Sequence, residues 1–68
     1  MNERQHFPSP WTAEQLAESF VVRDANGQSL AYVYFAEAER AMTTRRLEED
    51  DARRIAHAIA RLPDIIKR

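Results

Sequence analysis

A turn motif between two runs of β-branched and aromatic residues constrains this chain more than any other feature. Residues 20–23 (FVVR) and 30–35 (LAYVYF) flank Asp24-Ala25-Asn26-Gly27, which contains the only glycine among the 68 residues. Runs of this composition favour β-strands, and glycine supplies the positive φ that tight hairpin connections need. The motif predicts a β-hairpin whose type I turn is closed by a G1 bulge, with Asp24 opposite Gln28.

The turn type also sets the register of the hairpin. With Asp24 opposite Gln28, Val22 lies opposite Leu30 and Phe20 lies opposite Tyr32. A two-residue Asn-Gly turn would shift every pairing by one residue. The first register, which we favour, places on one face the side chains of Phe20, Val22, Leu30, Tyr32 and Tyr34. The other face then carries Val21, Arg23, Ala31, Val33 and Phe35.

The segment before the hairpin allows two interpretations. Alternation from Trp11 to residue 17 permits a strand, whereas the composition of residues 13–18 permits a helical turn capped by Thr12. We predict a strand, because a third strand would support a hairpin that is marginally stable in isolation. Residues 1–10 contain Pro8 and Pro10, which disfavour helix, and we interpret them as a flexible N-terminal arm that ends where Trp11 docks on the core.

An amphipathic helix is predicted in the C-terminal part of the chain. Residues 48–62 (EEDDARRIAHAIARL) follow a connection over 37–46 and begin with four acidic residues, which are favourable at a helix N-terminus. Glu49 with Arg53, and Asp50 with Arg54, are i,i+4 pairs. Pro63 is expected to end the helix. The apolar face consists of Ala52, Ile55, Ala56, Ile59 and Leu62.

Together these elements predict one small domain of the α+β class over residues 11–68. It would contain an antiparallel β-meander of two or three strands, with one C-terminal α-helix packed on the sheet. A chain of this length buries only about 60% of the surface that its unfolded form exposes, and a hydrophobic content of 44% suits a small core. The net charge of −1 is unevenly spread: residues 1–39 hold two cations and six anions, and residues 40–68 hold eight cations and five anions.

Three stretches carry a resemblance to a known family. They are FPSPW (residues 7–11), FVVRDANGQSLAYVYF (residues 20–35) and DARRIA (residues 51–56), which Leu62-Pro63 follows. With these stretches the chain resembles a family of short uncharacterised alphaproteobacterial proteins, and the DANGQ-x-LAYVYF block is the most distinctive part. The resemblance covers most of the chain and implies neither an activity nor a ligand nor a partner.

Residue types suited to catalysis or metal binding are few. The chain has no cysteine, and its two histidines are His6 in the arm and His57 on the polar helix face, where neighbouring arginines disfavour protonation and metal ligation. Gly27 serves the hairpin, so no glycine-rich phosphate loop is present. We therefore expect no enzyme, no catalytic residue, no cofactor, no metal and no small-molecule ligand. Without a long apolar run or a signal-peptide-like stretch in residues 1–10, we expect no membrane contact and a cytoplasmic location.

The second strand of the hairpin is apolar on both faces, whereas one helix covers only one face of a sheet. The uncovered face must meet the N-terminal arm, the Ile65-Ile66 tail or another chain. We hypothesise a non-enzymatic protein-interaction module, whose partner is a second copy in a homodimer or an unidentified protein. Coverage by the chain's own ends is the alternative. The predicted interface consists of Val21, Ala31, Val33 and Phe35.

Nucleic-acid binding is the alternative function. An anionic partner would meet the C-terminal arginines, with Tyr32 or Tyr34 available for stacking. The acidic residues 48–51 offset the nearest arginines, so we favour a solvated helix face with i,i+4 pairs. The predicted contacts to an anionic partner are Arg45, Arg46, Arg53, Arg54 and Arg61.

Overall fold

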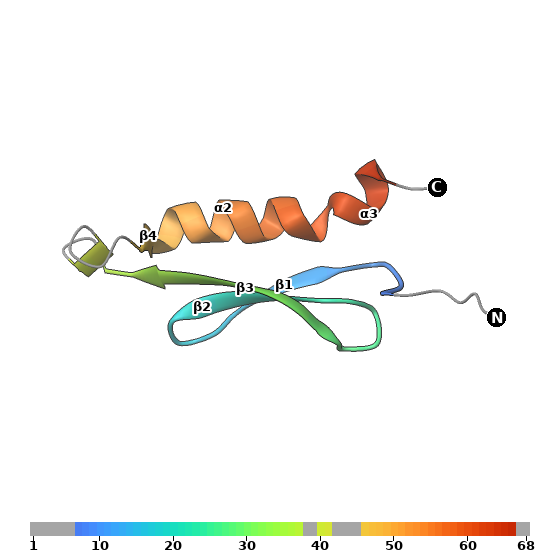
Figure 1. The fold of residues 1–68 in the computed structure, drawn as a ribbon, viewed down its shortest axis with the longest axis horizontal. Helices are drawn as coiled ribbons and strands as arrows, with labels where there is room; N and C mark the ends of the chain where they lie inside the picture. Colours follow the sequence, from blue (N-terminus) through green and yellow to red (C-terminus); the bar gives the residue numbers. More distant parts are fainter. Residues whose placement is uncertain (1–6, 38–39, 42–45, 67–68) are drawn as a thin grey trace.

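The computed structural model describes residues 7–37, 40–41 and 46–66, and shows a four-stranded sheet with a helix on one face (Figure 1). Strands lie in the order β1-β2-β3-β4; the first three are antiparallel, and β4 is parallel to β3. The predicted α+β class, with a C-terminal helix packed on a sheet, is confirmed. The elements are β1 (Thr12–Gln15), β2 (Ser19–Arg23), β3 (Ser29–Ala36), β4 (Leu47–Glu48), α2 (Glu49–Ala60) and α3 (Leu62–Ile65).

The segment before the hairpin is a strand, as predicted, and not a helical turn. Ala13 of β1 pairs with Val22 and packs against the core, whereas Glu14 is exposed. Strand β4 was not predicted, because its two residues beside Phe35 and Ala36 are too few to leave a period in the sequence. Of the predicted connection, residues 38–39 and 42–45 lie outside the described part of the chain.

The hairpin turn has the predicted form. The N–H of Asp24 donates to the carbonyl of Gln28 at 3.0 Å, and Gly27, with φ at 86°, donates its N–H to the carbonyl of Asp24 at 3.0 Å. The buried Asp24 carboxylate also accepts the N–H groups of Asn26 at 2.8 Å and of Gln28 at 2.9 Å. One aspartate therefore holds both sides of the turn.

Beyond the turn, the predicted pairings are wrong. Val22 pairs with Ala31 and not with Leu30, because Leu30 is an extra residue in β3 between two paired positions. In the same way Phe20 pairs with Val33 and not with Tyr32. This bulge places side chains without polar atoms beneath the helix and leaves the tyrosine hydroxyls at the solvent, which lowers the desolvation cost.

The core lies between the sheet and α2. The rings of Phe20 and Phe35 lie 5.5 Å apart with an interplanar angle of 49°, a favourable tilted arrangement. Ala52 and Ala56 of α2 are fully buried, and their small side chains allow the helix to approach the strands closely. Trp11 packs at the border of this core, as predicted. The buried cluster consists of Phe20, Val22, Phe35, Ala52 and Ala56.

Helix α2 begins one residue later than predicted and ends at Ala60, before Leu62. Pro63 lies in the first turn of α3, where the missing proline N–H loses no hydrogen bond, so it begins a second helix instead of ending the first. None of the helices in the described residues is long and apolar enough to cross a membrane.

The described part of the N-terminal arm contacts the hairpin. The carbonyl of Pro8 accepts the N–H of Ala25 at 2.9 Å, and the indole N–H of Trp11 donates to the carbonyl of Phe7 at 2.9 Å. Residues 1–6 of the arm lie outside the described residues.

Candidate functional site

In the part of the chain that the structure describes, the outer edge of β3 is open along most of its length. Strand β3 has eight residues, and β4 pairs only with Phe35 and Ala36. Within the described residues, no strand pairs with the outer edge of residues 30–34. The N–H of Phe35 donates to the carbonyl of Glu18 at 3.1 Å, toward β2. Because this direction alternates along an antiparallel ladder, the N–H and C=O groups of Tyr32 and the N–H of Tyr34 point to the free edge. The Tyr34 C=O faces β4, whose parallel pairing of Leu47 with Phe35 uses it as an acceptor.

The sequence of this edge contains none of the residues that commonly protect exposed strands. Natural sheets place lysine, proline or inward-pointing charges on their edges to prevent pairing with other chains. Strand β3 (SLAYVYFA) contains no charged residue and no proline. Its bulge at Leu30 lies at the beginning of the free segment, so residues 31–34 offer a regular edge for an added strand.

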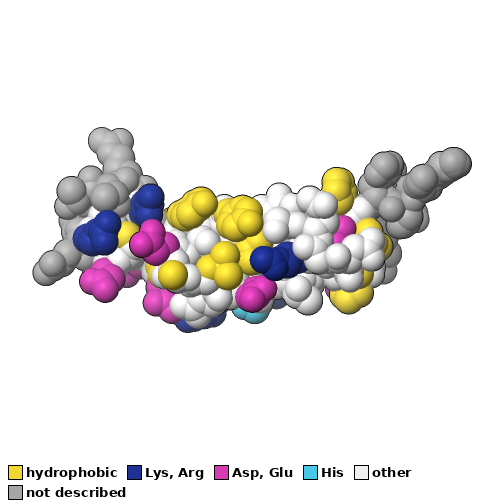
Figure 2. Space-filling model, turned by 90° about the horizontal axis from the view of Figure 1, so that it is seen from below, with side chains coloured by type: hydrophobic (Ala, Val, Ile, Leu, Met, Phe, Trp, Pro, Cys, Tyr) yellow, Lys and Arg dark blue, Asp and Glu magenta, His cyan; other side chains and the backbone are white. Residues whose placement is uncertain are grey.

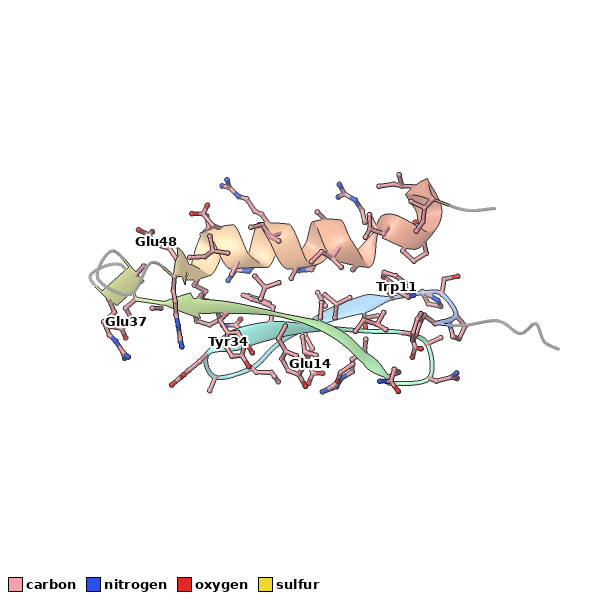
Figure 3. All side chains as sticks on the ribbon, in the orientation of Figure 1. Trp11, Glu14, Tyr34, Glu37 and Glu48 are labelled. Atoms are coloured by element: carbon pink, nitrogen blue, oxygen red, sulfur yellow. The ribbon has the colours of Figure 1, made fainter. Side chains whose placement is uncertain are left out.

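Two tyrosines occupy the sheet face that the helix leaves open. Tyr32 is 49% exposed and Tyr34 is 53% exposed, and their rings stack with centroids 6.2 Å apart. The Tyr32 hydroxyl donates to the Ser29 hydroxyl at 3.4 Å, and the Arg46 guanidinium lies 5.6 Å from the centre of the Tyr34 ring. Figure 2 shows hydrophobic side chains gathered on this face, and in Figure 3 Tyr34 points away from α2.

The flank of α2 on the β3 side is apolar. On the opposite flank, the Gln15 amide of β1 donates to the Glu49 carboxylate at 2.9 Å. Helical spacing places Ile55 and Ile59 on the other flank, toward β3. Ile55 is 42% exposed, and Ile59 is half-buried against the core. We call this region the β3 edge surface: the free edge of residues 30–34 with the side chains of Tyr32, Tyr34, Ile55 and Ile59.

The four residues of the predicted interface do not share one surface. Phe35 is in the core cluster, and Ala31 and Val33 pack against it beneath α2. Val21 belongs to the opposite face, where it is completely buried between its register neighbours Glu14 and Tyr32. The sequence did show an alternating strand with two tyrosines on one face, but the wrong register assigned those tyrosines to the helix side.

Two of the predicted arginines are held by carboxylates of their own helix. Arg53 lies 3.1 Å from Glu49 and 2.8 Å from Asp50, and its guanidinium lies 5.6 Å from the centre of the Phe20 ring. Arg54 lies 3.4 Å from Asp50. Both predicted i,i+4 pairs are therefore confirmed.

The other predicted arginines lie apart from these. Arg46 lies over Tyr34, on the open side of the sheet, and Arg61 borders a groove at the end of α2. Arg45 lies outside the described residues. The structure thus does not gather the four described arginines into one basic surface.

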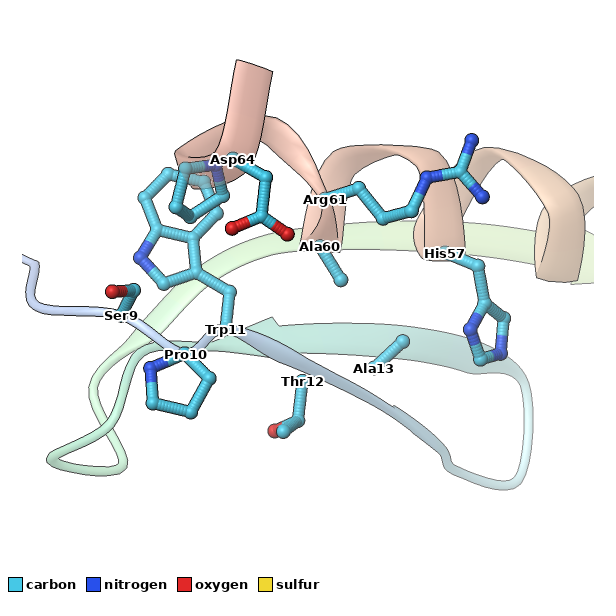
Figure 4. A pocket seen from close by; sticks show the side chains of 10 residues that line it. Ser9, Pro10, Trp11, Thr12, Ala13, His57, Ala60, Arg61 and Asp64 are labelled. Atoms are coloured by element: carbon cyan, nitrogen blue, oxygen red, sulfur yellow. The ribbon is translucent and has the colours of Figure 1, made fainter. Parts of the chain in front are cut away.

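A groove of about 550 Å³, which we call the Trp11 groove, lies between β1, the end of α2, and α3 (Figure 4). Trp11 and Pro63 supply apolar walls, and His57, Arg61 and Asp64 lie at its border. The sequence analysis missed this groove, because its walls come from segments more than 40 residues apart that only tertiary packing brings together. Because the Arg61 guanidinium and the Asp64 carboxylate both line the groove, its charges do not favour an anion.

No three His, Cys, Asp or Glu side chains are grouped to hold a metal ion in the described part of the chain. Comparison with models of protein families, with curated proteins and with solved structures found no match for this chain.

Proposed function

We propose that this protein is a non-enzymatic protein-interaction module that binds an extended segment of a partner along the β3 edge surface. The observation that carries the proposal is the outer edge of residues 30–34, with which no described strand pairs, in a strand without charge or proline. A partner strand would satisfy the outward N–H and C=O groups of Tyr32 and the outward N–H of Tyr34, as in other cases of strand addition.

The side chains around the edge support this mode of binding. A strand placed beside β3 would lie near Tyr32 and Tyr34 on the open face and near Ile55 on the helix face, so it would cover apolar surface on both sides. Aromatic residues favour such contacts, because they bury a large area and lose little conformational freedom. The Trp11 groove offers no comparable set of unpaired backbone groups.

A synthetic peptide with the sequence of β3, SLAYVYFA, flanked by lysines for solubility, tests the proposal directly. It is titrated into the isotope-labelled protein at a concentration too low for self-association, and the amide resonances are followed by NMR. We expect the amides of Tyr32 and Tyr34 to shift and to become protected from exchange with solvent. The amides of Ala31 and Val33, which already donate within the sheet, should change less.

The matched control is the substitution Tyr32→Pro. Proline at this position removes an outward N–H and no hydrogen bond to β2, so the sheet should persist while the edge loses its central donor. Binding should therefore disappear in this variant, with the far-UV circular dichroism spectrum retained. Shifts confined to the Trp11 groove, or equal binding by the variant, would contradict the proposal.

Binding of nucleic acid by the C-terminal arginines is the second candidate, and the contact between Arg46 and the exposed Tyr34 ring favours it. Arg53 and Arg54 form ion pairs with acidic residues of their own helix, which offset the positive charge that a phosphate would meet. We therefore favour the protein-interaction module. A titration with single-stranded and duplex DNA at low ionic strength distinguishes the two, because the phosphate contribution is strongest there. No binding under those conditions would eliminate nucleic acid as a partner.

A further inference from the structure

We infer that the partner strand is β3 of a second copy of this chain, so that two molecules form one continuous sheet. This inference rests on the proposed function and names the partner for the same β3 edge surface. Antiparallel pairing of one strand with its own copy satisfies two-fold symmetry, and symmetric dimers of this kind use the same surface of both subunits.

The limits of the free edge fix the register of this pairing. The bulge at Leu30 limits the free edge at one end, and β4, which begins to pair at Phe35, limits it at the other. Between these limits Tyr32 is the residue whose N–H and C=O both point to the free edge, so the two-fold axis is expected at Tyr32. A two-fold axis at that position places Tyr32 opposite Tyr32 of the second copy, and Leu30 opposite Tyr34. The N–H of Tyr32 in each copy then donates to the C=O of Tyr32 in the other copy.

The side chains are compatible with this arrangement on both faces. Directly opposed residues in an antiparallel pair lie on the same face. On the open face, the stacked Tyr32 and Tyr34 rings of one copy would lie beside the same two rings of the second copy. On the helix face, half-buried Ala31 and Val33 would meet their counterparts, and the Ile55 flanks of the two helices would approach each other. Because β3 has no charged residue, self-pairing apposes no like charges within the strand.

The available apolar area predicts a weak dimer. Each half-exposed tyrosine offers roughly 100 Å², and Ile55 offers less, whereas a standard stable interface buries about 800 Å² on each partner. We therefore expect a dissociation constant on the order of 100 μM. Sedimentation equilibrium should cover about tenfold to either side of that value, so that both monomer and dimer are populated.

Charge substitutions at the symmetry axis test both the partner and the register. The variants Tyr32→Lys and Tyr32→Glu each oppose two like charges across the axis, so each alone should show a dissociation constant raised at least about tenfold. An equimolar mixture opposes a cation and an anion, and association should return. Thr12→Lys and Thr12→Glu place the same charges on the exposed opposite edge of the sheet and should leave association unchanged.

The outcomes separate this inference from the proposed function. A wild-type chain that remains monomeric at the highest concentration overturns the dimer, and so does a mixture of folded variants that fails to associate. If the β3 peptide still protects the amides of Tyr32 and Tyr34 in either case, strand addition stands and only the identity of the partner is wrong. If neither the peptide nor a second copy pairs with the edge, both are wrong.

Discussion

Tyr32 and Tyr34 stack on the open face of β3, with ring centroids 6.2 Å apart and an interplanar angle of 20°. Their separation by two residues puts both side chains on one face and also directs both backbone N–H groups to the same edge. The two most exposed side chains of the strand therefore coincide with its unpaired backbone groups. An added strand could therefore form hydrogen bonds with the backbone of this edge and contact both tyrosine side chains at the same time.

Amide exchange should reveal the alternation along β3 in the monomer. At low concentration, the N–H groups of Ala31 and Val33 should exchange slowly because they donate within the sheet, whereas those of Tyr32 and Tyr34 should exchange quickly. Hydrogen–deuterium exchange followed by NMR measures each rate. As the concentration rises, only the tyrosine amides should gain protection. Equal protection of all four amides at every concentration would show that the edge is already covered.

Asp24 should contribute strongly to stability, because its buried carboxylate accepts two backbone N–H groups of the turn. Asp24→Ala leaves the N–H groups of Asn26 and Gln28 without this acceptor, and we expect a loss of about 1–3 kcal/mol in the free energy of unfolding. Asp24→Asn keeps an acceptor oxygen and should lose less. Urea denaturation measures both variants. Equal stability of the two would show that the acceptor oxygen is not what matters.

The contact between α2 and the sheet should not tolerate larger side chains. Ala56 is fully buried on the side of α2 that faces the sheet. The substitution Ala56→Leu should therefore force the helix away from Phe20 and Phe35 and lower the free energy of unfolding by about 1–3 kcal/mol. The matched control is Ala58→Leu on the exposed side of the same helix, which should change stability by less than about 0.5 kcal/mol. Thermal unfolding compares the two variants. A neutral Ala56→Leu would indicate that the core has unfilled space.

The two neighbouring helix arginines should differ in their contribution. Arg53 contacts two carboxylates and the face of Phe20, so Arg53→Ala should cost about 1 kcal/mol, with part of that loss retained at high salt. Arg54 has one carboxylate at 3.4 Å and a side chain that is 77% exposed, so Arg54→Ala should cost less than about 0.5 kcal/mol. Urea denaturation at low and high ionic strength separates the charge contribution from the ring contact. Equal losses would mean that the Phe20 contact contributes nothing.

Local signals predicted most of the fold. Gly27 and Asp24 defined the hairpin turn, because positive φ and a short acceptor side chain act within four residues. The helix followed from apolar spacing, and its ion pairs followed from residues one turn apart. Strand β4 and the Trp11 groove had no such signal, since each depends on contacts between distant segments.

The candidate site depends on a feature that the sequence did not predict, namely which face of β3 the helix leaves uncovered. From the letters alone, β3 is apolar on both faces, so one face or edge must remain available once a single helix has packed. The identity of that face depended on one extra residue, Leu30, which exchanges the two faces of β3 relative to β2. The turn residues alone did not predict this exchange, whereas the bulge brings Phe20, Val33 and Phe35 together beneath α2, where they pack in the core. The sequence by itself therefore determined that an uncovered surface exists, and only the tertiary structure decided that Tyr32 and Tyr34 lie on it.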